Sequence, residues 1–292
     1  MLGPTSAAES ELPFDIDTVL PTRDFDHHIG AKRANPAEYF TPTLEHDVVI
    51  TERRQILAEH PERHIGMDED AGDLLVSTIV WAKANSILPD DVIQKLDKEQ
   101  SLQEKLAILA CTWEPDFLLL GQNESQFFLR GGVVCFPSNW DFTQKINHPL
   151  EQIHQIVPRL NECIGKNIAT FLARMRDGIS WQRVNWGMSS SPKKNNHPAL
   201  GMPRLQASTP LDSVSFRVEE QLLQSLPSNG LLFGIHVRRT NLRNVLNNPK
   251  AAAGLNQALA TMNEEMARYK GIADIRQTII DDINEQPQKK LN

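Results

Sequence analysis

The chain has 292 residues, of which 40% are hydrophobic and 23% are charged, and its formal net charge is −7. These values are ordinary for a water-soluble globular protein of one large or two small domains, and the acidic balance argues against a surface that binds nucleic acid. No segment reaches the roughly eighteen apolar residues of a membrane span, and the N-terminus lacks the make-up of a signal peptide, so we expect neither a membrane anchor nor export.

The three cysteines, Cys111, Cys135 and Cys163, are widely spaced and odd in number. They therefore exclude a fully paired disulfide framework and any CxxC metal motif. This pattern predicts a protein of the reducing cytoplasm.

The first part of the chain predicts an arm followed by helices. Residues 1–34 are rich in Pro, Asp, Ser and Thr, and we expect an extended arm that lies on the body of the protein. Residues 35–110 predict a helical cover, which begins with Asn35 as N-cap and Pro36 at the first helical position. The helices are expected over about 45–59, 69–84, 89–97 and 101–109.

The pattern changes near residue 111, where short apolar runs between turn residues replace the helical period. Strands are expected over 117–121, 126–137, 181–188, 215–223 and 230–238, and helices over 160–175 and 248–271. Residues 189–212 predict a polar loop, either a lid or a mobile insertion, and the latter is favoured. Residues 276–292 are expected to form a tail that is disordered beyond Asp282.

About five strands with flanking helices, and no regular strand–helix–strand alternation, indicate an α+β domain over residues 111–275. Its sheet is expected to be antiparallel.

The segment from 134 to 158 carries two histidines between prolines, His148 and His154. A helix begun by Pro149 would place His154 on the same face as Leu150 and Ile153, so its imidazole would be buried. A neutral imidazole in an apolar pocket can bind haem iron, whereas a core histidine held by hydrogen bonds is the plainer alternative. His148 fits a turn, and the spacing of the two histidines does not match a zinc pair.

Several well-known sequence motifs are missing. There is no GxGxxG after a strand, no GxxxxGK[ST], no GxSxG and no HxE…CxxC. The sequence therefore gives no local support for nucleotide-dependent, hydrolase or deaminase chemistry, and any redox reaction must take its electrons from elsewhere.

Four segments together resemble the haem-dependent oxidative N-demethylase-like family: CFPSNWDFTQKINHPLEQIHQIVPRL, WQRVNWGM, FRVEEQLLQSLPSNGLLFGIHV and MARYKG. The resemblance extends from about Phe25 to Gly271. It implies a PAS-like antiparallel sheet that holds haem b with a histidine on the iron. It also implies O2-dependent demethylation of a small secondary amine such as dimethylamine, which releases formaldehyde, with electrons from a separate flavin and iron–sulfur reductase.

Carried onto this chain, the IHxxVP match places the iron ligand at His154. The chain departs from the family pattern at Glu220 and His236, where the family has Arg. These departures bear on the substrate, and they make His236 a rival ligand.

Other site residues follow from strand phase. Arg217 and Glu219 are two residues apart on one predicted strand and should share a face, where they could meet a haem propionate and an amine cation. A surface ion pair is the alternative. Trp140, Asn185 and Trp186 are expected to line the pocket, although tryptophans also serve as plain core residues.

Two other functions stay open at this point. A haem or gas sensor of the same fold would bind haem without turnover, and a cofactor-free interaction protein would bind none. A Soret band would distinguish the two haem proteins from the interaction protein, and formaldehyde release would distinguish the enzyme from the sensor.

Overall fold

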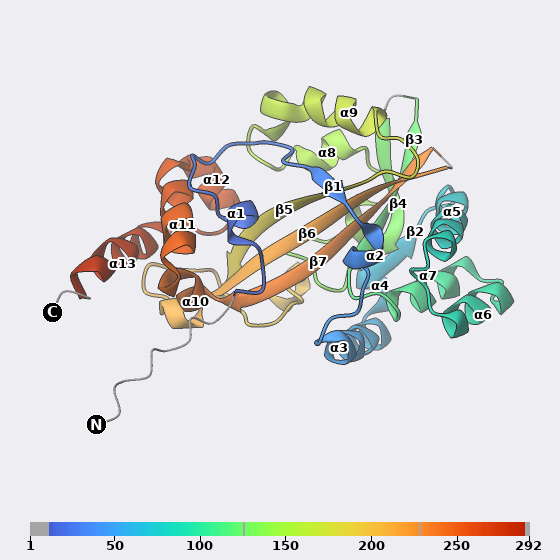
Figure 1. Cartoon of the computed structure of the whole chain (residues 1–292), viewed down its shortest axis with the longest axis horizontal. Coiled ribbons are helices and arrows are strands. Elements are labelled where there is room, and N and C mark those ends of the chain that lie inside the picture. Colours follow the sequence, from blue (N-terminus) through green and yellow to red (C-terminus); the bar gives the residue numbers. More distant parts are fainter. Residues whose placement is uncertain (1–11, 125, 228, 290–292) are drawn as a thin grey trace.

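The computed structural model describes residues 12–124, 126–227 and 229–289. Within these ranges one seven-stranded antiparallel sheet forms, in the order β1-β5-β6-β7-β3-β4-β2 (Figure 1). The strands are β1 (Lys32–Ala34), β2 (Ile65–Met67), β3 (Asp116–Asn123), β4 (Gln126–Val133), β5 (Ser180–Ser189), β6 (Ser215–Leu226) and β7 (Gly230–Asn241). This arrangement confirms the expected α+β, PAS-like sheet with flanking helices.

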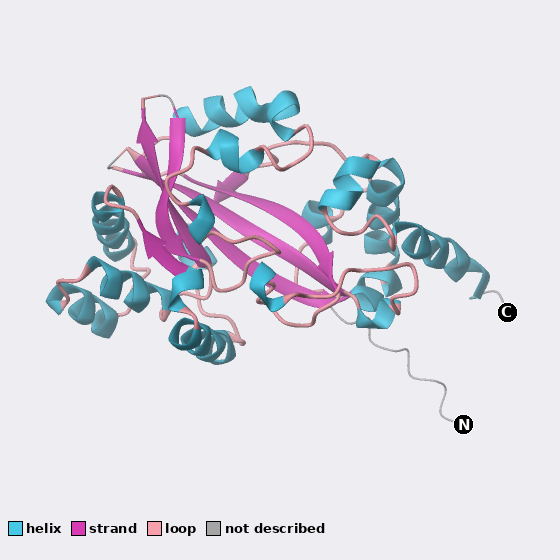
Figure 2. Cartoon of the chain, turned by 180° about the vertical axis from the view of Figure 1, so that it is seen from behind, coloured by secondary structure: helices cyan, strands magenta, loops and turns pink. Residues whose placement is uncertain are grey.

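Helices surround the sheet in three groups (Figures 1 and 2). One group gathers at one end of the sheet: α2 (Pro36–Tyr39), α3 (His46–Glu59), α4 (Pro61–His64), α5 (Ala71–Ala84), α6 (Asp90–Lys98) and α7 (Leu102–Ala110). A second group lies along the sheet: α8 (Leu150–His154) and α9 (Lys166–Ala173). The third gathers at the opposite end: α1 (Ile16–Val19), α10 (Leu242–Asn247), α11 (Pro249–Thr261), α12 (Glu264–Tyr269) and α13 (Arg276–Lys289). None of these described helices is long and apolar enough to cross a membrane.

The five predicted strands and the four predicted helices of residues 35–110 are confirmed, with shifts of a few residues at their ends. The sequence missed β1 and β2, because three residues are too short to show a period of two. The predicted helix over 248–271 is wrong as one element. It is divided after Thr261, because Met262 is extended and the side chain of Asn263 accepts a hydrogen bond from the Met266 amide, which caps α12.

The expected disorder beyond Asp282 is contradicted within the described residues, where α13 continues to Lys289. Two contacts explain the helix. Ile279 is fully buried against the C-terminal helices, and Arg243 Nη1 pairs with the carboxylate of Asp282 at 2.7 Å. Residues 1–11 of the predicted arm and 290–292 of the predicted tail lie outside the described ranges.

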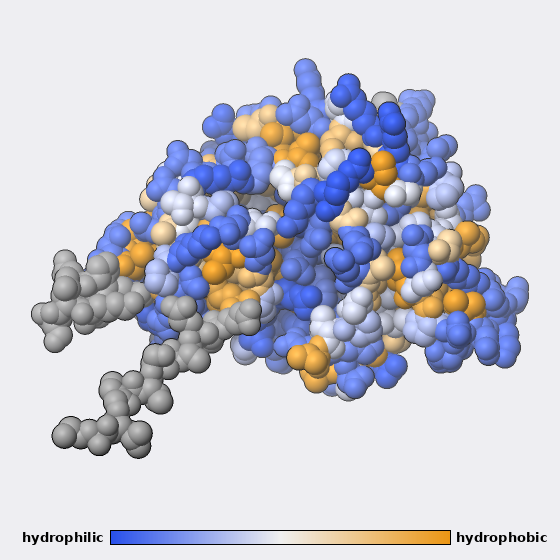
Figure 3. All heavy atoms as spheres, viewed as in Figure 1, coloured by the Kyte–Doolittle hydropathy of each residue, from blue (hydrophilic) through white to orange (hydrophobic). Residues whose placement is uncertain are grey.

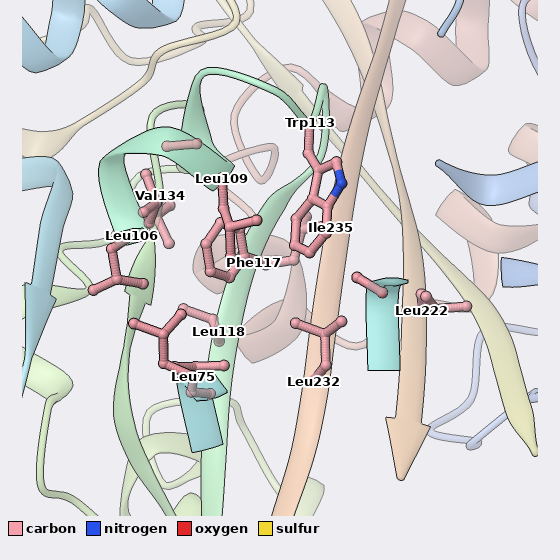
Figure 4. Close-up of a cluster of buried hydrophobic side chains, with 14 of the residues drawn as sticks. Leu75, Leu106, Leu109, Trp113, Phe117, Leu118, Val134, Leu222, Leu232 and Ile235 are labelled. Carbon is pink, nitrogen blue, oxygen red and sulfur yellow. The ribbon is translucent and has the colours of Figure 1, made fainter. Parts of the chain in front are cut away.

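Two hydrophobic clusters hold the structure together. The larger joins α5 and α7 to β3, β4 and β7, with Trp113, Leu106 and Leu109 at its centre (Figure 4). Each fully buried leucine of this kind contributes about 1.5–3 kcal/mol. The smaller joins the arm to β5, β6 and the C-terminal helices, where Phe14 lies against Phe216.

One glycine is required by close packing between β3 and β4. Gly132 on β4 has φ +145°, and a Cβ at this position would lie 2.2 Å from the carbonyl oxygen of Phe117 on β3. Only glycine permits this approach of two backbones.

Candidate functional site

A cavity of about 1090 Å³ lies between one face of the sheet and helices α8 and α9. It is as large as the largest pockets that take drug-sized ligands, which are roughly 300–1,000 Å³. Strand alternation decides which side chains enter the cavity: on β6 and β7 the lining residues are odd-numbered. The even-numbered residues face the other side of the sheet, where Gly230 lies against Leu74 of α5 and Gly234 lies against Tyr39 of α2.

One end of the cavity is apolar. Its sheet wall is formed by Leu118, Leu120, Leu129, Leu223, Phe233 and Ile235. Helical residues face them across the gap: Ile153, Ile164, Ile168, Phe171 and Leu172. This end suits an apolar ligand group.

The other end is polar, with Glu219 as its centre. Its carboxylate accepts hydrogen bonds from Ser138 Oγ at 2.6 Å, from Gln221 Nε2 at 2.9 Å and from Asn185 Nδ2 at 3.4 Å. Asn185 is paired with Glu219 in the register of β5 and β6. The structure therefore brings Glu219 and Asn185 together in the cavity wall.

Arg217 lies on the same face as Glu219, but it is deeply buried, and its guanidinium is bonded to protein. It donates to the carbonyl oxygens of Lys193 and Phe136 and to Ser138 Oγ, each at 3.3 Å. Because Ser138 in turn donates to Glu219, Arg217 helps to position that carboxylate.

His154 closes α8 and lines the cavity. Its ring is half-buried, and neither ring nitrogen has a hydrogen-bond partner within the described ranges. Burial, with a smaller effect of the Arg183 cation, lowers the pKa of His154 below its ordinary value. At neutral pH the imidazole is therefore uncharged and has a free lone pair, which is the form that binds a metal ion.

The rival ligand, His236, does not line the cavity. It is an even-numbered residue of β7, so it faces the opposite side of the sheet, where Nε2 lies 3.3 Å from the carboxylate of Glu114. Only 4% of the residue is exposed. The expectation that His236 could compete for the ligand in this cavity is wrong, and the residue is a core histidine with its own partner.

Glu114 has four donors around its carboxylate, from Thr43, His46 and His236. Burial alone would raise its pKa, but these hydrogen bonds outweigh burial and lower the pKa to about 2. Burial lowers the pKa of His236 as well, despite the opposing effect of Glu114.

Acid is therefore expected to weaken the fold through this network. In the folded protein both pKa values lie below those of the unfolded chain, which are 6.5 for His236 and 4.5 for Glu114. As the pH falls through these values, the unfolded chain binds more protons than the folded protein, so acid shifts the equilibrium toward unfolding. Glu114 alone should remove about 2 kcal/mol from the free energy of unfolding between pH 5 and pH 3. Urea unfolding at both pH values measures this, and Glu114→Gln should show a smaller loss; equal losses would contradict the assignment.

The two predicted tryptophans occupy different places. Trp140 is half-buried in the cavity wall, with its ring edge toward Phe142. Trp186 borders the cavity but is buried in the smaller hydrophobic cluster, where it stacks on Phe216 at 5.7 Å. Trp186 is thus as much a core residue as a pocket residue.

The sequence missed two cations in the site, Arg183 and Lys270. Arg183 lies on β5 two residues before Asn185, so strand alternation places it on the same face as Asn185 and could have identified it. Lys270 follows α12 and donates from Nζ to the carbonyl oxygen of Trp186 at 2.7 Å, at the edge of β5. Burial lowers the pKa of Lys270 to about 8. Nothing in the local sequence connects it with β5.

The described part of the N-terminal arm forms a further wall of the cavity. The arm runs across the face seen in Figure 1. On the same face, Figure 3 shows hydrophilic residues with hydrophobic residues on either side of them. Phe25 N donates to Thr261 Oγ1 at 2.8 Å, and His27 Nε2 donates to the carbonyl oxygen of Pro158 at 2.8 Å. The arm is thus fixed to the C-terminal helices and to the segment just after His154.

Residues 195–197 in the loop over 189–212 are packed against the protein, so this part of the loop does not fit the expected mobile insertion. Asn195, Asn196 and His197 are buried, and Asn196 exchanges backbone hydrogen bonds of 3.1 Å with Pro137 and Asn139. The loop thereby supports the segment that carries Ser138.

Comparison with known protein families adds one finding. Residues 78–280 match the family described as haem-dependent oxidative N-demethylase, alpha subunit-like. This stretch runs from within α5 to the start of α13 and includes the sheet face, α8 and α9, and His154. The description points to an oxidative enzyme that depends on haem. The chain belongs to the haem-dependent oxidative N-demethylase, alpha subunit-like, family.

Proposed function

We propose that the cavity binds haem b with His154 as the ligand to iron, and that the protein demethylates a small secondary amine of the dimethylamine type. In this proposal O2 is the oxidant, formaldehyde is released, and a separate flavin and iron–sulfur reductase supplies electrons. The observation that carries the proposal is an uncharged, unpartnered imidazole on the wall of a large cavity that is apolar at one end and charged at the other.

The residues present fit haem in three respects. The apolar end matches the porphyrin ring, and His154 matches the iron. At the polar end, Nε of Arg183 and Nε of Arg217 are buried and have no hydrogen-bond partner among the described residues. Buried donors without partners favour an acidic group, such as a propionate, at this end. When bound, haem supplies the oxygen chemistry, and the protein supplies the ligand and the surroundings.

Glu219 is the residue that we assign to the amine. Its carboxylate is held from one side by Ser138 and Gln221, and it faces the cavity. It can pair with an ammonium group or accept a hydrogen bond from a neutral amine. Glu219 is partly buried in the cavity wall, which strengthens this interaction relative to one in bulk water.

Glu219→Gln is therefore expected to weaken amine binding without removing haem. Loss of a charged hydrogen bond costs about 1.5–3 kcal/mol, which corresponds to an increase of about 10- to 100-fold in the KM for dimethylamine. Formaldehyde release with an added reductase measures this. Glu220→Gln is the matched control, because the next carboxylate along β6 faces the other side of the sheet and pairs with Arg238 Nε at 3.2 Å. Equal KM values for the two variants would show that Glu219 does not bind the amine.

A further inference from the structure

Arg183 differs from the other charged groups of the cavity because its partners are missing. Its side chain is half-buried in the wall, and its Nε is buried without a hydrogen-bond partner. Within the described ranges, no carboxylate lies within ion-pair distance of its guanidinium. Its pKa is lowered by burial, with Glu219 acting weakly in the opposite direction.

The neighbouring charges do not balance it. The charged sheet residues that line the cavity are Arg183, Arg217 and Glu219, and Lys270 adds a third cation at the edge of β5. Arg217 is already bonded to two carbonyl oxygens and to Ser138. Over the whole lining the cations still outnumber the carboxylates: the cations are Arg23, Lys145, Arg183, Arg204, Arg217, Arg268 and Lys270, and the carboxylates are Asp24, Asp26, Glu219 and Asp274. Unbalanced charge in a partly buried wall is costly. An anionic ligand group would remove this cost.

We propose that Arg183, with Lys270 beside it, forms a subsite for a carboxylate group inside the cavity. A guanidinium presents a planar fork that matches a carboxylate with two parallel hydrogen bonds. The apolar far end of the cavity can take the uncharged part of the molecule that carries the acid, and Glu219 can take an amine if the molecule has one. Two sources carry this chemistry: a porphyrin propionate, or the carboxylate of an N-methyl amino acid as substrate. The second source rests on the proposed function, whereas the subsite rests on the charges alone.

The first experiment uses metal-free protoporphyrin IX and its dimethyl ester with the full chain, so neither iron nor turnover is needed. Binding is followed by quenching of tryptophan fluorescence, since Trp140 and Trp186 border the cavity. The wild type should bind the diacid at least about tenfold more tightly than the diester. Arg183→Gln should abolish this preference, and Arg183→Lys, which keeps the charge without the fork, should retain part of it.

Arg174→Gln is the matched control, because it makes the same change in net charge at an exposed residue at the end of α9. It should leave the preference unchanged. Urea midpoints equal to the wild type show that the variants are folded; if Arg183→Gln is unstable, Arg183→Lys decides the result.

The second experiment compares N-methylglycine with dimethylamine in the haem-loaded protein. If the carboxylate belongs to the substrate, kcat/KM is higher for N-methylglycine than for dimethylamine, and Arg183→Gln lowers the ratio of these two kcat/KM values at least about tenfold. If Arg183→Gln loses the preference for the porphyrin diacid but keeps the substrate preference, the subsite belongs to a propionate. If Arg183→Gln changes neither the porphyrin preference nor the substrate preference, the subsite does not exist. Haem binding without formaldehyde release would instead contradict the proposed function and leave the porphyrin result standing.

Discussion

Replacing His154 with alanine is expected to lower the affinity for haem by more than about 100-fold and to reduce formaldehyde release to background. Changes to groups that merely support a metal ligand already cost about 10- to 100-fold, and this change removes the ligand itself. The Soret band of any haem that remains should shift, because its iron has lost an imidazole. A haem titration followed by absorbance measures both effects.

His148→Ala is the control for this prediction. His148 is the other histidine of the same segment, but it does not line the cavity, and its Nδ1 donates to the carbonyl oxygen of Ile146 at 3.1 Å. This variant should bind haem as the wild type does. Addition of free imidazole to His154→Gly should restore the spectrum, which a merely structural role of His154 does not explain.

The second large effect is expected on stability, at the buried pair of Arg53 and Asp116. Arg53 on α3 is completely buried, and its Nη1 lies 2.6 Å from Asp116 Oδ1. Asp116 also accepts hydrogen bonds from the amides of Cys135 and Phe136, at 2.9 and 2.8 Å. The pair thus joins the helical cover to the segment that leads to Ser138 and the cavity.

Arg53→Met should therefore reduce the free energy of unfolding by about 3–5 kcal/mol, because it leaves Asp116 buried and unpaired. This is a large part of the roughly 5–15 kcal/mol that stabilises most proteins. Urea unfolding at pH 7 measures the change. Arg54→Met is the neighbouring control: Arg54 is exposed, and its loss should cost less than about 0.5 kcal/mol. Similar values for the two variants would show that the pair has no special role.

Strand phase was the most productive signal in the sequence. The spacing of Arg217 and Glu219 placed both in the cavity wall, and the apolar spacing around His154 placed that residue on the covered side of α8. Both predictions depend on local periodicity, which the sequence contains directly.

The remaining features depend on tertiary contacts that no local pattern contains. Lys270 enters the site from the end of α12 by reaching the edge of β5, and His27 does so by crossing from the arm to Pro158. His236 looked like a free ligand because the partner that satisfies it, Glu114, precedes it by more than a hundred residues. The α13 helix likewise exists because Ile279 is buried against helices that precede it.

A titration of the full chain and of His154→Ala with haem, followed at the Soret band, tests directly whether His154 binds the haem iron. Ligation of the iron by His154 predicts saturation at one haem per chain for the wild type, a spectrum typical of iron bound by imidazole, and little or no such species for the variant. A wild type that binds no haem, or a variant whose titration and spectrum match those of the wild type, would contradict it.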